Sequence, residues 1–342
     1  MSEPAITLTP ARAPAPASFV RGRAWLRAVT GFAIWLLAYF ALNPDWPTAL
    51  LWLGALVHVP LALGLVLTGT ERFDPRAAKA NALLNFVAWA QLPGALMLVA
   101  GFTDELSGIL LALPWIFLTG LCAVAGVMRI LKLGVRRPGA LADWGLIWLA
   151  VSGAWTGASA MRWEAFGFSH IFVLLAAVHQ LYAGLVLQVV ASRIVAARPG
   201  RIPWLAAVGV SLGNPAVAFG ITATHMGAPT WLEFACVIFY AGSVIVLGWM
   251  QLFLALWPRS GLPGATRALL VLSDLSLGTA MTLAIIFGWG VARGYPTMTI
   301  PEMLQWHAPL NAFGFGLCAL VGWMLAMGGR AHGPAPAPRA TC

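Results

Sequence analysis

The sequence predicts an all-α membrane protein, a polytopic bundle of about ten transmembrane helices with both termini in the cytoplasm. Of its 342 residues, 60% are hydrophobic and only 9% are charged, and the mean hydropathy is +0.84. Soluble domains carry about 25% charged residues and about 45–50% apolar ones. A soluble fold of this size has too little interior to bury so much apolar surface. The composition therefore excludes a soluble enzyme, a disordered chain and a disulfide scaffold.

The chain divides into one membrane domain and two tails. Residues 1–23 are rich in Ala and Pro and contain no apolar stretch followed by a cleavage site, so we expect a disordered cytoplasmic tail rather than a secretory signal. Residues 24–327 form a single transmembrane helical domain, and residues 328–342 form a second cytoplasmic tail.

A helix needs about 20 mostly apolar residues to cross the hydrocarbon core. Ten such runs follow one another along the chain. They fall near 25–42, 47–67, 80–101, 106–128, 141–161, 167–191, 203–224, 230–257, 266–290 and 302–327. The fifth run is the weakest, because Gly153, Gly157 and several Ser and Ala residues dilute it.

The distribution of Lys and Arg predicts the orientation of these spans. With ten spans, 18 of the 20 Lys and Arg residues fall on one side, and only Arg162 and Arg293 fall on the other. Cytoplasmic loops carry such an excess of positive charge. We therefore expect a multi-pass protein of the cytoplasmic (inner) membrane.

Several partners are excluded by the same pattern. The net charge of +9 is spread between apolar runs and forms no single basic patch, which argues against nucleic acid. Neither GxGxxG nor GxxxxGK[ST] occurs, which argues against a bound nucleotide. The four cysteines show no CxxC spacing. We expect no metal and no cofactor, and as partners only the lipid bilayer and a lipophilic small molecule.

Ionisable side chains inside membrane spans are costly and therefore mark candidate functional sites. Glu233 and Asp274 are the candidate acids, and His179 and His307 the candidate bases. These four residues are the candidate catalytic residues.

Other polar or aromatic residues near them are candidate contacts for a substrate. They are Tyr182, Asn311, His225, Trp306, Asn214 and Glu302. His179 and Tyr182 are three residues apart and His307 and Asn311 four, so each pair shares a helix face. Glu302 can equally act as an N-terminal helix cap, His225 can be a loop residue, and His58 is expected to be a hydrogen-bonded packing histidine.

Two stretches of the sequence resemble a known family. Val178-His-Gln-Leu-Tyr-Ala-Gly-Leu185 is similar to the HFHYAGF run of the YndJ-like membrane proteins, with Gln180 and Leu181 in place of an aromatic residue and the second histidine. Trp306-His-Ala-Pro-Leu-Asn-Ala-Phe-Gly-Phe-Gly316 resembles the family's HG-x-x-N-x-x-GF signature, with Ala308 in place of a glycine. The resemblance implies a ten-span bundle with His179, Tyr182, His307 and Asn311 at the site, and it names no reaction.

Three functions fit these residues. The first is a membrane-bound cyclase or isomerase that performs acid/base chemistry on a lipophilic small molecule, such as an epoxidised isoprenoid, in terpene-type biosynthesis. The second is a proton-coupled transporter or exporter of a small lipophilic compound, although no internal repeat supports a carrier. The third is a haem or metal membrane protein, which is disfavoured because no span carries two histidines at ligand spacing.

Overall fold

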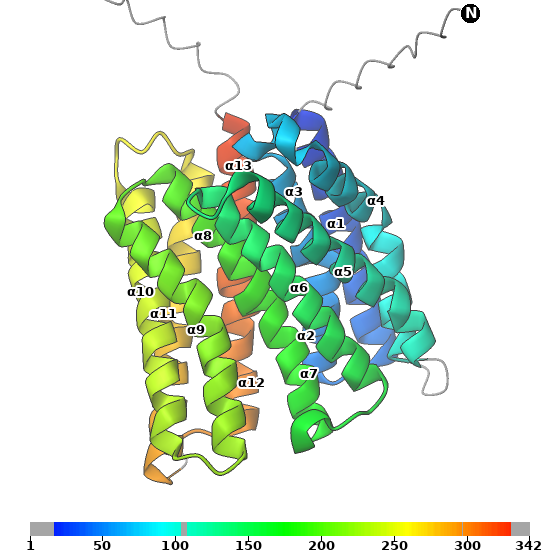
Figure 1. Cartoon of the computed structure of the whole chain (residues 1–342), viewed down its shortest axis with the longest axis vertical. Helices are drawn as coiled ribbons and strands as arrows, with labels where there is room; N and C mark the ends of the chain where they lie inside the picture. Colours follow the sequence, from blue (N-terminus) through cyan, green and yellow to red (C-terminus); the bar gives the residue numbers. More distant parts are fainter. Residues whose placement is uncertain (1–16, 104–107, 296, 330–342) are drawn as a thin grey trace, which may run out of the picture.

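The computed structural model describes residues 17–103, 108–295 and 297–329, and in these ranges it contains helices and no strands. The helices run up and down in one bundle, so that the start of α1 and the end of α13 lie at the same end (Figure 1). Seven rods are single helices: α1 (Ala17–Leu42), α4 (Ala78–Gly101), α5 (Gly108–Leu133), α6 (Pro138–Ala160), α9 (Arg201–His225), α10 (Thr230–Leu256) and α11 (Gly264–Arg293).

Three further rods are interrupted by a π-helical segment. The first consists of α2 (Trp46–Leu53), η1 (Gly54–His58) and α3 (Val59–Leu67). The second consists of α7 (His170–His179), η5 (Gln180–Val186) and α8 (Leu187–Ala197). The third consists of α12 (Ile300–Pro309), η6 (Leu310–Leu317) and α13 (Cys318–Gly329). Short 3₁₀ turns η2 (Thr70–Phe73), η3 (Pro75–Ala77) and η4 (Ala165–Gly167) lie in the connections.

The polytopic all-α prediction is confirmed. Within the described ranges, nine rods are long and apolar enough to cross a membrane. The rod that falls short is α6, the diluted fifth run. Because both ends of the described chain lie at the same end of the bundle, α6 must nevertheless run from one end to the other, as its neighbours do (Figure 1).

The N-terminal boundary differs from the prediction. Residues 17–23, expected to belong to the tail, form the first turns of α1. A helix can extend past the hydrocarbon where its side chains are charged and reach the headgroups, and the first turns of α1 carry Arg21 and Arg23. The remaining tail predictions fall on residues outside the described ranges, apart from the last turn of α13.

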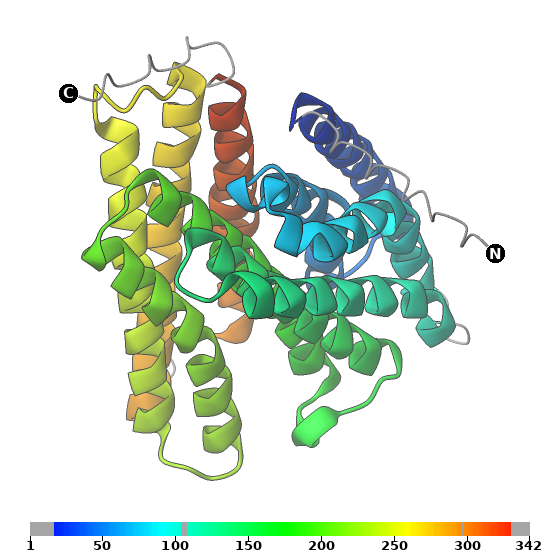
Figure 2. The same ribbon diagram turned by 45° about the horizontal axis from the view of Figure 1, so that its top comes forward.

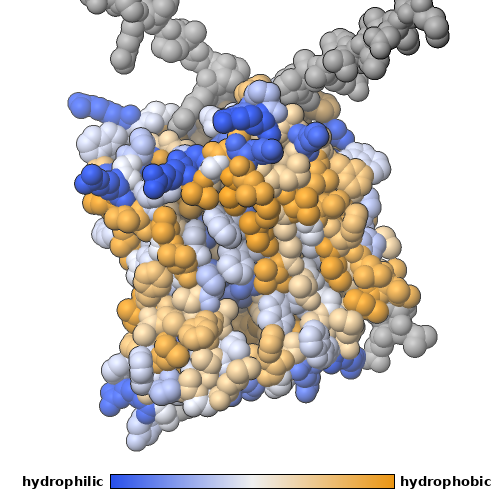
Figure 3. Space-filling model, in the orientation of Figure 1, coloured by the Kyte–Doolittle hydropathy of each residue, from blue (hydrophilic) through white to orange (hydrophobic). Residues whose placement is uncertain are grey.

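The surface shows a membrane-spanning pattern. On the face that Figure 3 shows, apolar residues cover much of the surface between the two ends, and the strongly hydrophilic residues gather at these ends. The Arg-rich connections α3–α4, α5–α6, α8–α9 and α10–α11 all lie at the end that also holds the start of α1.

The three interrupted rods meet in the centre of the bundle. The most apolar stretch of the α2–η1–α3 rod is entirely buried, and that of the α7–η5–α8 rod is 78% buried. Figure 2 shows α9, α10 and α11 on one flank, and α1, α4 and α5 on the other. The segments η1, η5 and η6 contact one another in the centre.

Close backbone approach in this centre depends on glycine. A Cβ atom at Gly316 of η6 would lie 3.1 Å from Nε2 of the His58 ring and 3.0 Å from the Asn311 carbonyl oxygen. Gly31 and Gly184 likewise allow η1 and η5 to lie against α1 and α6.

A buried ionic cluster joins four elements near the Arg-rich end. Arg129 of α5 donates from Nε to Asp143 of α6 at 2.7 Å and from Nη1 to Asn81 of α4 at 2.7 Å. Arg137 pairs with the same carboxylate and with Glu71 of η2. Arg129 and Asp143 are essentially unexposed. Burial raises the pKa of Glu71, but its backbone hydrogen bond and the charges of Arg129 and Arg137 hold that pKa below its ordinary value.

Removal of the central arginine should therefore destabilise the fold strongly. Arg129→Met leaves the buried Asp143 carboxylate with one partner fewer, and breaking a buried pair in this way costs about 3–5 kcal/mol. Arg136→Met removes an exposed arginine nearby and should change stability by less than about 0.5 kcal/mol. Unfolding in mixed micelles measures both, and equal stability of the two variants would contradict a structural role for the cluster.

Gly316→Val should also destabilise the protein, by about 1–3 kcal/mol, because the new side chain collides with the His58 ring. The matched control is Gly278→Val in α11, where a Cβ atom meets nothing within 4 Å. Thermal unfolding of both variants tests this difference. A Gly316 variant as stable as the control would show that η1 and η6 do not pack as described.

Candidate functional site in the middle of the bilayer

The π-helical segments bring together polar residues from distant parts of the chain. A π-helical turn is wide, leaves carbonyl groups without their usual α-helical partners, and occurs frequently at functional sites. His58, the last residue of η1, donates from Nε2 to the carbonyl oxygen of Ala312 in η6 at 2.9 Å. Tyr182 of η5 donates to the Leu50 carbonyl oxygen at 3.0 Å, and its ring packs edge-on against the His58 ring.

The structure agrees with the expectation that His58 is a hydrogen-bonded packing histidine, since its ring is fully buried and bonds to the Ala312 carbonyl oxygen. It also places His58 at the junction of all three π-helical segments. It lies between the two stretches that carry the family resemblance. Only its position inside an apolar run marked it in the sequence.

A second group of polar residues surrounds His179. Asn214 of α9 is fully buried and donates from Nδ2 to Oε1 of Gln180 at 2.8 Å. Asn214 also lies close enough to interact with the His179 ring. The buried atoms Nε2 of His179 and Oδ1 of Asn214 nevertheless have no hydrogen-bond partner among the described residues. An unsatisfied polar atom at this depth is costly, so both atoms are available to a ligand.

His307 faces the same region from α12. Its Nδ1 lies 2.9 Å from the Ala280 carbonyl oxygen of α11. Because a carbonyl oxygen only accepts, Nδ1 carries the proton, and Nε2 of the neutral ring is left with a free lone pair. Asn311 donates to the His307 carbonyl oxygen at 2.9 Å, one turn along. His307 and His179 interact electrostatically.

We call His179, Asn214, His307 and Asn311 the histidine site. At a rise of about 1.5 Å per residue, its side chains lie on the order of 10–16 Å from the helix ends opposite the Arg-rich end, near mid-membrane. His179, His307 and Asn311 are partly exposed. Figure 3 shows less hydrophobic residues and a hollow in the middle of the face that α7, α9 and α12 form.

The candidate acid Asp274 lies apart from the histidine site, nearer the Arg-rich end. Gln251 of α10 donates to its Oδ1 at 2.9 Å, and Trp323 of α13 donates to Oε1 of Gln251 at 2.8 Å. Oδ2 of Asp274 is buried and has no hydrogen-bond partner among the described residues. The chain thus holds only one of the two carboxylate oxygens by a hydrogen bond.

The other candidate acid, Glu233, is at the opposite end of the bundle. It is buried in the first turn of α10, where it faces Thr224 of α9. The α-carbon of Glu233 would lie 3.0 Å from a Cβ atom at Gly220, so α9 and α10 pack closely here. The structure brings neither acid into the histidine site.

Three other candidates form local contacts or lie on the surface. Glu302 forms a capping box with Thr299 at the start of α12, which is the alternative role that its sequence position allows. His225 is exposed and stacks on Phe168, with ring centres 4.2 Å apart. Trp306 is 58% exposed on the outside of α12. A role for these three in substrate binding stays a prediction.

No group of three His, Cys, Asp or Glu side chains close enough to hold a metal ion occurs in the parts of the chain that the structure describes.

Comparison with known proteins adds a family. The family model described as "YndJ-like protein" matches residues 49–315, which include η1, η5 and most of η6. The "Uncharacterized membrane protein YndJ" of Bacillus subtilis is 26% identical over 235 residues, which are 68% of this chain. The chain spans about 41% of the length of that relative. No solved structure matches. Since the family model covers most of the chain, including the centre where the π-helical segments meet, this protein belongs to the YndJ-like family of membrane proteins.

Proposed function

We propose that the protein is an enzyme of the cytoplasmic membrane that performs acid/base chemistry on a lipophilic small molecule, with the polar group of the substrate bound at the histidine site. The observation that carries this proposal is the pair of unsatisfied atoms, Nε2 of His179 and Oδ1 of Asn214. A hydroxyl or similar group of a substrate can bond to both atoms, while its apolar part remains in the bilayer.

His307 is the proposed base. Its Nδ1–H bond to Ala280 fixes both the ring position and the tautomer, so that Nε2 accepts a proton from the substrate. His179 and Asn214 orient the reacting group. In an acid/base isomerisation or cyclisation, one proton enters the substrate and another leaves it, so that no external oxidant or reductant is consumed.

Asp274 is the proposed proton reservoir. Its free Oδ2 exchanges protons, and the hydrogen bond from Gln251 to Oδ1 keeps the side chain in one orientation. Because Asp274 does not touch the histidine site, transfer between them requires intervening water or movement. Glu233 takes this role if the proton instead comes from the other end of the bundle.

Proton-coupled transport is the second candidate, and one observation favours it. Ionisable groups occur at three depths: Glu233 near one end, the histidine site in the middle and Asp274 toward the other end. Proton relays across membranes use such a series. An enzyme and an exporter make different predictions, which two experiments separate.

The first experiment is a comparison of lipophilic compounds in a deletion strain and its parent, extracted separately from cells and medium. The enzyme proposal predicts an unconverted precursor and the absence of the product from both fractions. Complementation with His307→Gln should restore less than about 1% of the product, because removal of a general base costs about 10²–10⁴-fold. His170→Gln, which changes an exposed histidine at the start of α7, is the control and should restore product fully.

A finished product that is retained inside the deletion cells would contradict the enzyme and support export. Full complementation by His307→Gln, with normal protein levels in the membrane, would exclude His307 as the base.

The second experiment uses Asp274→Asn, which keeps the side-chain shape and removes the exchangeable proton. For the enzyme we expect accumulated precursor and at least about tenfold less product at unchanged protein level, because proton supply becomes limiting. For a transporter we expect normal product whose movement in liposomes no longer responds to a pH gradient. Unchanged product and unchanged gradient dependence would exclude Asp274 from both mechanisms.

A further inference from the structure

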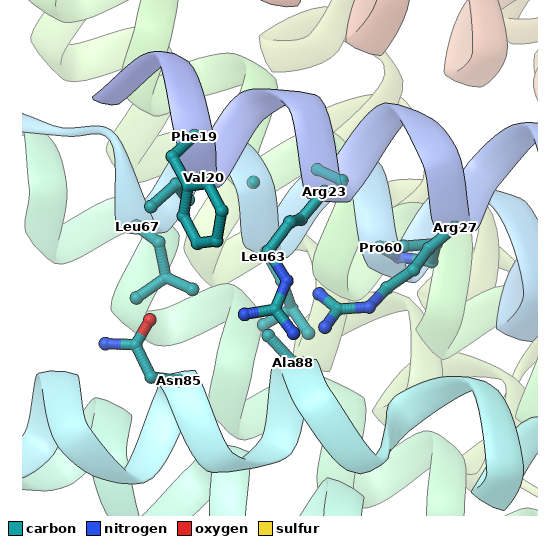
Figure 4. Close-up of a pocket in the computed structure, with 11 residues that line it drawn as sticks. Phe19, Val20, Arg23, Arg27, Pro60, Leu63, Leu67, Asn85 and Ala88 are labelled. Atoms are coloured by element: carbon teal, nitrogen blue, oxygen red, sulfur yellow. The ribbon is translucent and has the colours of Figure 1, made fainter. Parts of the chain in front are cut away.

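We propose that the protein binds the phosphate group of an anionic phospholipid in a pocket between α1, α3 and α4. The pocket has a volume of about 90 Å³ and is lined by Arg23, Arg27 and Asn85 together with apolar residues (Figure 4). It lies at the Arg-rich end of the bundle. Its lining residues lie between positions 19 and 88 and include no residue of the histidine site.

The two arginines point into this pocket together. They are four residues apart on α1 and therefore share one face. Figure 4 shows both side chains reaching from α1 toward α4, with the guanidinium groups converging above Leu63 and Ala88. The Arg27 guanidinium is close enough to Arg23 to be affected by its charge. The Arg23 guanidinium also packs over the Phe19 ring, 5.3 Å from its centre, which helps to hold it in place.

This arrangement lacks a counter-charge within the protein. Among residues 17–103, 108–295 and 297–329, no carboxylate forms a salt bridge with Arg23 or Arg27. The acidic residues Glu71 and Asp74, in the connection between α3 and α4, are paired with other arginines. Two like charges held side by side at a membrane surface repel each other, and a bound anion removes that repulsion.

The chemistry of the pocket selects a phosphate at the end of an apolar tail. Guanidinium groups bind phosphate oxygens through paired hydrogen bonds, and basic pockets between helices on the cytoplasmic side bind anionic headgroups. The pocket holds a small charged group rather than a whole lipid. Exposed apolar residues on the same two helices, Leu26 of α1 and Phe86 and Trp89 of α4, offer a surface for acyl chains.

The test measures thermal unfolding of the purified full chain in a zwitterionic detergent, with dioleoyl phosphatidylglycerol, dioleoyl phosphatidylcholine or sodium phosphate added in increasing amounts. A ligand that binds only the folded state raises the unfolding temperature. We expect phosphatidylglycerol to raise it, and the other two additives to leave it unchanged at equal concentration.

The double variant Arg23→Gln/Arg27→Gln should need roughly tenfold more phosphatidylglycerol, or more, for the same shift, since each arginine near an anionic lipid contributes measurably. Its lipid-free unfolding temperature reports whether it folds. Asn85→Asp is a second variant, which keeps both arginines but places a negative charge at the pocket, and it should weaken the shift likewise. The control Arg136→Gln/Arg201→Gln removes two exposed arginines at the same end and should respond as the wild type does.

Three results would overturn the proposal. An unchanged response of both pocket variants would place the lipid elsewhere, and an equal shift with phosphatidylcholine would remove the headgroup preference. Competition by sodium phosphate at concentrations equal to those of the lipid would assign the pocket to free phosphate instead.

Discussion

Within a bilayer, a backbone carbonyl that lacks its helical partner has no water to accept from, and this constraint organises the centre of the protein. The three rods that meet in the centre contain π-helical segments, which disturb the regular α-helical bonding. Side chains of neighbouring rods bond to carbonyl groups there: His58 bonds to Ala312, Tyr182 to Leu50 and Gln91 to Ala55. Each of these bonds joins two rods, so hydrogen bonds from side chains to main-chain carbonyl oxygens connect the packed core.

The histidine site is built on this centre. Gln180 follows His179 at the start of η5, and its side chain accepts from Asn214, so the wide turn helps to fix the residues that face α9. Asn311, in η6, bonds back to the His307 carbonyl oxygen. The unsatisfied polar atoms of His179 and Asn214 therefore lie beside groups that are held by hydrogen bonds, which is the support that a binding or catalytic site requires.

The sequence predicted the architecture well because the bilayer imposes a simple length and hydropathy rule. Span positions agree closely with the helices, and the Arg distribution predicted which ends lie together. The sequence also allowed prediction of interactions between residues close in the chain, such as the helix cap at Thr299 and Glu302. Interactions between residues from distant segments could not be predicted. Asp143 was not recognised as part of an ionic cluster, because Arg129 and Asn81 lie on other helices. The hydrogen-bond partner of His58 was not predicted, because that carbonyl group is 254 residues away.

The weakly apolar α6 has a consequence for how the chain enters the membrane. Alone, α6 lacks the hydropathy that drives a helix into lipid, and it carries the ionisable Asp143 near its start. Its main ionic partner, Arg129, is on the preceding helix, only 14 residues away. If the two helices enter as a hairpin, the carboxylate and the guanidinium neutralise each other before either reaches the hydrocarbon. The apolar α5 would then supply the hydropathy that α6 lacks. Hairpin entry would thus give the ionic pair a role in insertion as well as in the finished fold.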